Sequence, residues 1–391
     1  MSGLHRLFAV GVCLAFAACS SAPKRSASNP FRTGDPIVDG KNMIESGPAK
    51  DRVLWQYRTA AAAMRRAQFD EAKRLLDDAL LTIGGISTQD KSARKARSYF
   101  SEESKKTFRG EPYERVMAYF YRGILYWMDG EPDNARACFR SAQIQDADTE
   151  NKQYAADYVL LDYLDGLATV KLGGDGSDAL KRATAESRFG TPPPYNAKAN
   201  ALFFVEFGQG PTKYATGEYR EELRIMPGRS VPQSALIKIE GVQSLGLRPY
   251  DDLSFQATTR GGRVMDHILA NKAVFKSSTD AAGNVGLLGG LVVAGTSRDR
   301  TAQEVGLGLA AAGLVTKIVS AVSTPAADTR AWENLPQFLS FAAVELPPGE
   351  HTASIEFLDA AGRPLSGLSR KVTMTIVPNR DTVVFVSDRS S

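Results

Sequence analysis

Histidine and cysteine are scarce in this chain, with three of each among 391 residues. Beyond the first eighteen residues the histidines are His267 and His351, and neither has a second histidine or a cysteine at metal-ligand spacing. The chain also lacks the phosphate-binding, dinucleotide-binding, zinc-protease and serine-hydrolase motifs. We therefore predict that the protein is not an enzyme, and we predict no metal, no cofactor and no small-molecule substrate.

A strong charge of one sign is missing as well. The formal net charge is only +4, and no dense basic run is interleaved with aromatic residues. A nucleic-acid-binding surface would need such a run, so we predict no nucleic-acid partner. Hydrophobic residues make up 43% of the chain and charged residues 24%, which is ordinary for globular proteins. A chain of this length is sufficient for two or three folded domains.

Residues 1–18 begin with a short basic stretch, continue with an apolar run over 7–16 and end in small residues before Cys19. This pattern is typical of a secretory signal peptide. Ending at a cysteine, it resembles the signal of bacterial lipoproteins, with residues 16–19 (Phe-Ala-Ala-Cys) as the lipobox and phenylalanine in place of the usual leucine. The resemblance implies that Cys19 carries acyl chains such as palmitate and anchors the protein in a membrane. The alternative is a secreted protein in which Cys19 stays free.

Serines follow Cys19, and in lipoproteins the absence of aspartate there permits export to the outer membrane. The resemblance thus implies a lipid-anchored protein of the outer membrane that faces the periplasm. Residues 19–50 are rich in Ser, Pro, Asn and Gly and have no hydrophobic period, which predicts a flexible tether. Cys138 is then the one cysteine beyond the anchor in the mature chain, so no intrachain disulfide is expected.

Helical periodicity of apolar residues governs residues 51–188, and it is clearest over 111–148. Small and aromatic residues recur there at offsets of 0, 4, 7, 16, 20 and 23, namely Tyr119, Gly123, Tyr126, Ala135, Phe139 and Ala142. This spacing suits two antiparallel helices in close contact, joined by a turn at 129–132. It resembles a tetratricopeptide repeat (TPR), except that Arg122 stands where the family usually has leucine. Residues 51–83 and 154–187 match the same register more loosely.

In TPR arrays the first helix of each pair lines a concave binding surface. By that resemblance, the surface here is formed by Leu54, Tyr57, Met64, Met117, Phe120, Ile124 and Trp127. These side chains are apolar or aromatic, so we predict a groove that buries an apolar partner such as an amphipathic helix. The alternative is that the chain supplies this cover itself, and of the two occupants we favour the chain's own cover, because a permanently exposed apolar patch promotes aggregation.

The pattern changes after the proline-rich residues 189–199, which no helix can cross and which we predict to be a linker. Residues 200–391 contain short β-rich runs separated by turns, which predicts an antiparallel β domain. Residues 285–322 interrupt it with two apolar segments rich in Gly and Ala, each with small residues four apart. We predict an inserted helical hairpin there, either packed against the rest of the protein or in contact with a membrane or a second copy.

Together these features predict an α+β multidomain protein, with N-terminal TPR-like helical hairpins before the antiparallel β domain. The architecture is similar to that of a group of bacterial envelope lipoproteins. The similarity rests on residues 110–115 (Gly-Glu-Pro-Tyr-Glu-Arg), on the repeat that follows them, and on residues 334–336 (Asn-Leu-Pro). It implies no activity. We predict a non-catalytic scaffold that binds other envelope proteins through its helices; the alternative is a membrane-interacting or self-assembling protein that uses residues 285–322.

Overall fold

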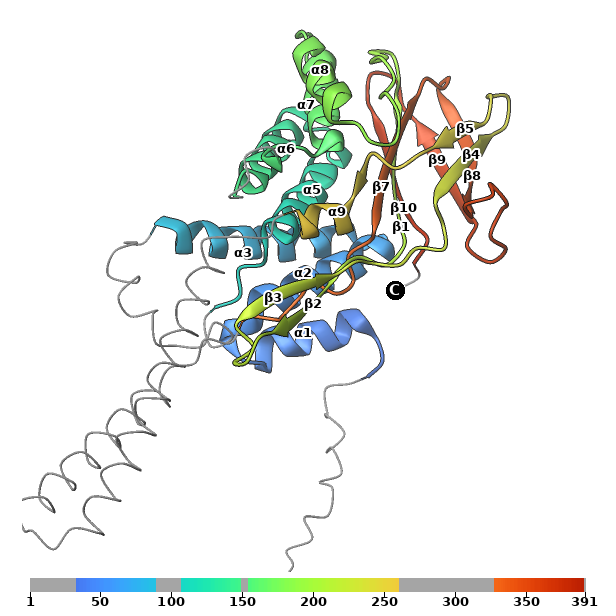
Figure 1. Cartoon of the computed structure of the whole chain (residues 1–391). Helices are drawn as coiled ribbons and strands as arrows, with labels where there is room; N and C mark the ends of the chain where they lie inside the picture. The colour runs from blue at the N-terminus through green and yellow to red at the C-terminus, as the bar shows by residue number, and fades with distance from the viewer. Residues whose placement is uncertain (1–32, 89–106, 149–153, 260–326, 390–391) are drawn as a thin grey trace, which may run out of the picture.

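A computed structural model describes residues 33–88, 107–148, 154–259 and 327–389 (Figure 1). The predicted signal peptide, Cys19 and the insertion 285–322 lie outside these residues. The described helices are α1 (Pro36–Ser46), the short 3-10 helix η1 (Ala49–Asp51), α2 (Arg52–Arg65), α3 (Phe69–Thr88), α5 (Pro112–Met128), α6 (Pro132–Asp146), α7 (Val159–Lys171), α8 (Ser177–Glu186) and α9 (Leu253–Thr258). The described strands are β1 (Ala201–Phe207), β2 (Thr212–Thr216), β3 (Glu222–Met226), β4 (Ser234–Ile239), β5 (Leu245–Leu247), β6 (Asp251–Asp252), β7 (Phe338–Val344), β8 (Gly349–Leu358), β9 (Arg370–Ile376) and β10 (Thr382–Ser387).

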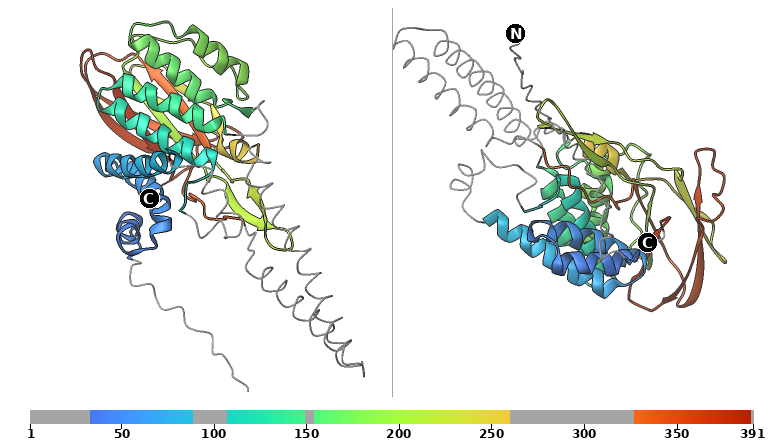
Figure 2. Two further views of the ribbon diagram at one scale, coloured as in Figure 1. Left: turned by 90° about the vertical axis from the view of Figure 1, so that its left-hand side faces the viewer. Right: turned by 90° about the horizontal axis from the view of Figure 1, so that it is seen from below.

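The helices form one layer in which consecutive helices pack as pairs, α2 with α3, α5 with α6 and α7 with α8 (Figures 1 and 2). Between α5 and α6, Gly130 adopts a φ of +83°, a conformation that glycine tolerates best, and Pro132 then starts α6. The two helices approach closely at Gly123, where a Cβ atom would lie 2.5 Å from the ring of Phe139. A small residue at this position therefore sets the distance between α5 and α6.

The strands form two larger sheets, ordered β10-β1-β7-β6 and β5-β4-β8-β9, and a separate hairpin of β2 and β3. Neighbouring strands of the larger sheets run antiparallel, except that β1 and β10 are parallel. The α+β layout predicted from the sequence is thus confirmed, with helices in the N-terminal part and antiparallel-rich sheets in the C-terminal part.

Strand β1 shows how the layers are joined. All its residues are buried, because both of its faces are covered. Alternate side chains of a strand point to opposite faces. Leu202 and Phe204 accordingly join the core shared with the helices, whereas Phe203 and Val205 join the core between the two sheets. The described part of the protein is therefore built as helices on a sheet, with a second sheet behind it (Figure 1).

The predicted flexible tether is wrong for its last part, because residues 36–46 form α1. Asp35 caps this helix by accepting hydrogen bonds from the N–H groups of Ile37 and Val38. The helix packs on α2, and a Cβ atom on Gly40 would lie 1.9 Å from the hydroxyl of Thr59. Only Ile37 and Gly40 of α1 are fully buried.

The prediction of separate helical and β domains is also wrong. One hydrophobic core continues from the helices into β1 and β7. The predicted linker is packed, since the Phe189 ring lies 6.0 Å from that of Phe338 and the Tyr195 ring 4.9 Å from that of Tyr163. The inner face of the helices is too apolar to remain in water, so the helices need the sheet as their cover.

Candidate functional site

The residues predicted to line the groove are all buried by the chain itself, so the occupant at these positions is not a separate partner, and the prediction of a partner-binding groove there is wrong. They are Leu54, Tyr57, Met64, Met117, Phe120, Ile124 and Trp127. The rings of Phe120 and Trp127 lie 6.2 and 6.4 Å from that of Phe204 in β1. The ring of Tyr57 stacks on Trp332 at 4.4 Å. The chain therefore covers these residues itself, with β1 and with the segment that contains Trp332.

The residues predicted to pack α5 against α6 lie at that contact: Ala135, Phe139 and Ala142 are buried, Gly123 lies against the ring of Phe139, and Tyr119 and Tyr126 are partly buried. Arg122 stands where a leucine was expected. Its guanidinium lies 3.5 Å from the ring centroid of Tyr126 and forms a 2.6 Å ion pair with Asp77 of α3. A cation–π contact and an ion pair thus take the place of a hydrophobic contact.

A segment that crosses the inner face of the helices, with a turn at residues 333–334, is the candidate functional site. Residues 327–337, here called the strap, form no helix or strand, yet Trp332 and Leu335 are fully buried. Basic side chains of other elements donate to its carbonyl oxygens: Lys213 of β2 to Arg330 (2.9 Å), Arg58 of α2 to Ala331 (3.1 and 2.6 Å), Arg65 of α2 to Asn334 (2.7 Å), and Arg389, after β10, to Leu335 (3.0 Å). The strap is thus held through its backbone, in the way that an extended peptide is held by a protein that recognises it.

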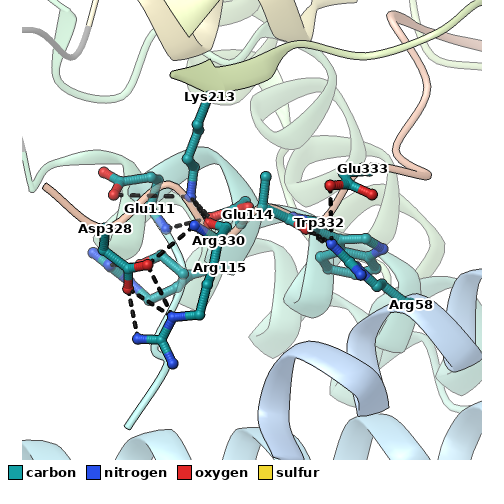
Figure 3. A network of polar contacts seen from close by, with 11 residues as sticks. Arg58, Glu111, Glu114, Arg115, Lys213, Asp328, Arg330, Trp332 and Glu333 are labelled. Carbon is teal, nitrogen blue, oxygen red and sulfur yellow. Dashed lines mark hydrogen bonds and ion pairs between the residues drawn. The ribbon is translucent and has the colours of Figure 1, made fainter. Parts of the chain in front are cut away.

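Glu114, in the first turn of α5, is the acidic partner of the strap. Its Oε1 accepts the backbone N–H of Trp332 at 2.6 Å. Its Oε2 accepts hydrogen bonds from the Lys213 ammonium and the Glu111 N–H, both at 2.6 Å (Figure 3). The side chains of Glu114 and Lys213 are 0% and 1% exposed. A carboxylate near a helix N-terminus is favoured by the helix dipole, and the added hydrogen bonds offset the loss of water around this pair.

Trp332 is the aromatic anchor of the strap. Its ring stacks on Tyr57 with 17° between the ring planes, and it lies 5.9 Å from the ring of Tyr121 in α5. Buried aromatic rings contribute both apolar area and a preferred geometry. Asn334 adds a further contact, because its side-chain amide donates to the carbonyl oxygen of Arg58 at 2.9 Å. The strap is therefore recognised through its side chains as well as its backbone.

Arg330 fixes the beginning of the strap. It forms 2.6 Å ion pairs with Asp51, at the start of α2, and with Asp328 of the strap itself. Its guanidinium also lies 5.4 Å from the ring centroid of Phe108, whose N–H donates to the carbonyl oxygen of Lys50. The strap, the start of α2 and the chain just before α5 consequently meet at one place.

A second buried network orients Arg65. Its Nε donates to Glu206 of β1 at 2.7 Å, and the Tyr121 hydroxyl donates to the other oxygen of that carboxylate at 2.5 Å. Burial, and next the charge of Glu206, raise the pKa of Tyr121 well above its ordinary value, so its hydroxyl stays a neutral donor. With Nε engaged in this way, Nη2 of Arg65 reaches the carbonyl oxygen of Asn334.

Other buried titratable groups have structural roles. Burial raises the pKa of the Asp251 carboxyl to about 8, and its oxygens accept the N–H groups of Val159 and Leu160 at the start of α7. Burial raises the pKa of the Cys138 thiol to about 11, which disfavours a nucleophilic thiolate near neutral pH. Within the residues that the structure describes, no group of three His, Cys, Asp or Glu side chains is placed to hold a metal ion.

Sequence reasoning did not identify the residues that hold the strap, although it singled out the two stretches that meet there. Glu114 belongs to residues 110–115 and Asn334 to residues 334–336, the two phrases on which the resemblance to envelope lipoproteins rests. Glu114 and Trp332 are 218 positions apart in the chain. A lone tryptophan in the polar run 328–334 was the available signal, because such a residue is seldom left in water.

In the described parts of the chain, no helix has both the length and the apolar character needed to cross a membrane. No family model, no curated protein and no solved structure matches the chain.

Proposed function

We propose that the protein is a non-catalytic lipoprotein of the cell envelope that acts as a protein–protein interaction scaffold. TPR-like hairpins α2–α3 and α5–α6 supply the binding surface. Acyl chains on Cys19 hold the protein at the outer membrane, and the folded part faces the periplasm. The partners are other envelope proteins.

The observation that carries this proposal is the way in which α2 and α5 hold the strap. Arg58 and Arg65 meet backbone carbonyls, Glu114 meets a backbone N–H, and Tyr57 stacks on the aromatic anchor. Backbone hydrogen bonds give affinity for any extended peptide, and an aromatic anchor gives specificity. The helical layer therefore has the chemistry of a peptide-binding surface, and the chain's own strap is bound to it.

The arrangement of the helices supports the TPR-like part of the proposal. The first helix of each pair, α2 or α5, contributes many more buried residues to the core than the second helix α6 does. The contact of Gly123 with Phe139 is the small-with-aromatic contact that the repeat register requires. In this proposal the β-sheet and the strap cover the surface formed by the first helices, which is the surface that binds the ligand in a TPR array.

Site-specific photo-cross-linking in intact cells tests the scaffold. Glu333 is a suitable position, because its side chain is largely exposed and its carboxylate lies 3.3 Å from Arg58 at the edge of the strap site. We expect cross-links from position 333 to a defined set of envelope proteins. The matched control is Glu350, an exposed position on β8 in the second sheet. The same products from both positions, or none from position 333, would contradict the scaffold.

The tether is tested separately by Cys19→Ser. The variant should leave the membrane fraction and appear in the soluble periplasmic fraction while its far-UV circular dichroism stays unchanged. Continued recovery of the variant in the outer membrane would show that the anchor is not the acylated cysteine.

The alternative function is a membrane-interacting or self-assembling protein that uses residues 285–322. One observation favours it: the residues on either side of 260–326 lie beside the same hairpin of β2 and β3. Helix α9 contacts β3, and the N–H of Ala327 donates to the carbonyl oxygen of Arg220, between β2 and β3. Non-acylated protein should then bind liposomes of outer-membrane lipid composition, and replacement of residues 285–322 by a short linker should abolish this binding. No binding by the intact chain would eliminate the alternative.

A further inference from the structure

Strand β10 is an edge of the sheet β10-β1-β7-β6, paired with β1 on one side. At its start, the N–H of Thr382 donates to the carbonyl oxygen of Asn200, just before β1. Just after its end, the N–H of Asp388 donates to the carbonyl oxygen of Glu206 in β1. The backbone groups of successive residues in a strand point alternately to its two sides. The even-numbered residues of β10 are therefore the ones whose N–H and C=O groups face β1.

The odd-numbered residues Val383, Phe385 and Ser387 turn their N–H and C=O groups to the other side. Within the parts of the chain that the structure describes, no hydrogen bond uses these groups. The side chains of Val383 and Phe385 are only partly buried, so this side of β10 reaches the surface. An unpaired row of backbone donors and acceptors of this kind is a template for a strand of another chain.

The other edges of the two larger sheets are protected in ways that proteins commonly use. Strands β5 and β6 are only three and two residues long. Strand β9 begins with Arg370 and Lys371, and the carbonyl oxygen of its Thr375 accepts a hydrogen bond from the Thr382 hydroxyl at 3.1 Å. Strand β10 is six residues long and contains neither a charged residue nor a proline. Of these four edges, β10 is the one suited to the addition of a strand.

Cationic side chains stand at both ends of this edge. Arg380 precedes β10 and Arg389 follows it. Arg370 of β9 reaches the same end as Arg389, because its Nη2 donates to the carbonyl oxygen of Asp388 at 2.8 Å. The guanidinium groups of Arg380 and Arg389 likewise donate to carbonyl oxygens. Among the described residues, none of these three arginines forms an ion pair with a carboxylate.

The carboxylates of the same stretch are engaged inside the protein. Asp381 accepts hydrogen bonds from the Lys171 ammonium at 2.7 Å and from the Trp127 indole at 2.9 Å. Asp388 accepts the N–H of Gly208 at 3.0 Å. Residues 370–389 contain four cationic and two anionic side chains, so the edge has an excess of positive charge. Carboxylates of a partner would complement it.

We propose that the free edge of β10 binds an extended segment of another protein, which joins this four-stranded sheet as a fifth strand and places a carboxylate at each end of the edge. The free backbone groups lie on residues 383–387, so the paired part of the segment is about five residues long. Backbone hydrogen bonds supply affinity in such strand addition, and the charged ends select the partner. The surface belongs to the sheet and not to the helices, so this inference goes beyond the proposed function and can fail independently of it.

A peptide-binding experiment tests the chemistry of the partner. It uses the mature chain with Cys19→Ser in solution and a fluorescein-labelled peptide of sequence Glu-Val-Thr-Val-Thr-Val-Glu. The control peptide has lysine at both ends. We expect saturable binding of the first peptide by fluorescence anisotropy, and at least tenfold weaker binding of the control. Equal binding of the two peptides, or no binding of the first, would overturn the proposal.

Amide hydrogen exchange at single-residue resolution locates the bound peptide. In the free chain, the N–H groups of Val383 and Phe385 should exchange faster than those of Val384 and Val386, which face β1. A saturating amount of the peptide should slow exchange at Val383 and Phe385 at least tenfold. Peptide binding without this protection would place the peptide elsewhere and overturn the proposal, and so would slow exchange at all four positions in the free chain.

A proline at the edge supplies the matched variant. Val383→Pro removes one outward N–H and leaves the bonds to β1 in place. Val383→Thr is the control, because it changes the side chain and keeps the N–H. We expect the proline to weaken peptide binding at least tenfold and the threonine less than threefold, whereas equal losses would overturn the proposal. If the proline variant does not fold, hydrogen exchange in the unchanged chain decides.

Sedimentation of the unchanged chain tests a different occupant of the edge. A partner protein as occupant predicts that the chain alone shows no dimer that depends on β10. A concentration-dependent dimer that Val383→Pro abolishes and Val383→Thr retains would make a second copy the occupant, and would overturn the partner proposed here.

Discussion

The sheet β10-β1-β7-β6 has two covered faces that differ in chemistry. On the face toward the second sheet, the buried residues carry no charge: they are aliphatic or aromatic, with Phe203 and Ile355 among them, apart from the buried Ser340 of β7. On the face toward the helices, the apolar core also contains buried charges, including Glu206 of the sheet itself and Glu114 of α5. Apolar packing tolerates exchange of one hydrophobic residue for another of similar volume, whereas a buried charge requires its particular partner.

This difference bears on the proposed peptide-binding surface. Charged groups on the helix face are hydrogen-bonded to backbone atoms of the strap, such as the Trp332 N–H and the Asn334 carbonyl oxygen. The interface between the two sheets stabilises the fold mainly by apolar packing, and the buried Ser340 hydroxyl there donates to the carbonyl oxygen of Arg248. If the comparison is right, damage on the helix face changes peptide recognition and stability together, and damage between the sheets changes stability alone.

The largest expected effect comes from Glu114→Ala. The change leaves the buried Lys213 ammonium with only the more distant Glu111 carboxylate, at 3.9 Å, and the Trp332 N–H without its acceptor. Breaking one side of a buried ion pair lowers the free energy of unfolding by about 3–5 kcal/mol. Urea denaturation measures the loss. The double variant Glu114→Leu with Lys213→Met removes both charges and should recover most of the lost stability. A loss below about 1 kcal/mol for Glu114→Ala alone would mean that this buried ion pair behaves like an exposed one, and would contradict the difference between the two faces of the sheet.

A pH dependence is expected from the helix face, at Asp251 of β6. Burial, together with the charges of Asp157 and Asp146, raises the pKa of this carboxyl to about 8 from an ordinary value of 3.8. The folded state therefore binds the proton more tightly than the unfolded state does. The contribution to stability is fully present below about pH 4 and is lost as the pH rises toward 8.

Asp251→Asn is the matched variant, because the amide oxygen still accepts an N–H of α7 but carries no charge. Its free energy of unfolding should change less between pH 5 and pH 8 than that of the unchanged chain, by an amount on the order of a few kcal/mol. Thermal denaturation at a series of pH values checks this. Parallel stability curves for the two proteins would mean that the carboxyl does not titrate in this range.

A smaller effect is expected between the two sheets. Ile355→Val removes one methylene from a fully buried side chain of β8 and should lower the free energy of unfolding by about 0.5–1.5 kcal/mol. Because Ile355 belongs to the core between the sheets, the strap should keep its contacts. Photo-cross-linking from position 333 should therefore give the same products with and without Ile355→Val. Loss of those products would show that the two faces are coupled.

The helix pair α5–α6 was predictable from the sequence because its contacts are local. Gly123 and Phe139 lie in consecutive helices joined by a short turn, so their spacing in the sequence brings them together. The burial of β1 was similarly readable in its continuous apolar run, 201–205. In both cases the information lies within one element or one pair of elements.

The strap and the shared core could not be derived in that way. The contact of Arg58 with Ala331 spans 273 positions, and the strap has neither helical nor strand periodicity to indicate its place. The apolar inner wall was recognised correctly as a surface that needs a cover, but its chemistry does not specify which part of the chain supplies the cover. Helix α1 was missed for a different reason, because few of its residues are buried.

The smallest effect is expected from an exposed ion pair on the outer face of the second sheet, which serves as the control for the buried charges. Lys238 of β4 and Glu356 of β8 form a 2.8 Å ion pair whose side chains are 48% and 20% exposed, and both remain accessible to water when the pair is broken. Lys238→Ala should change the free energy of unfolding by no more than about 1 kcal/mol, and less at high salt, because exposed pairs are weak and screened. The two ion pairs have nearly equal lengths, so geometry does not distinguish them. A loss as large as that of Glu114→Ala would mean that burial is not what makes the helix face sensitive.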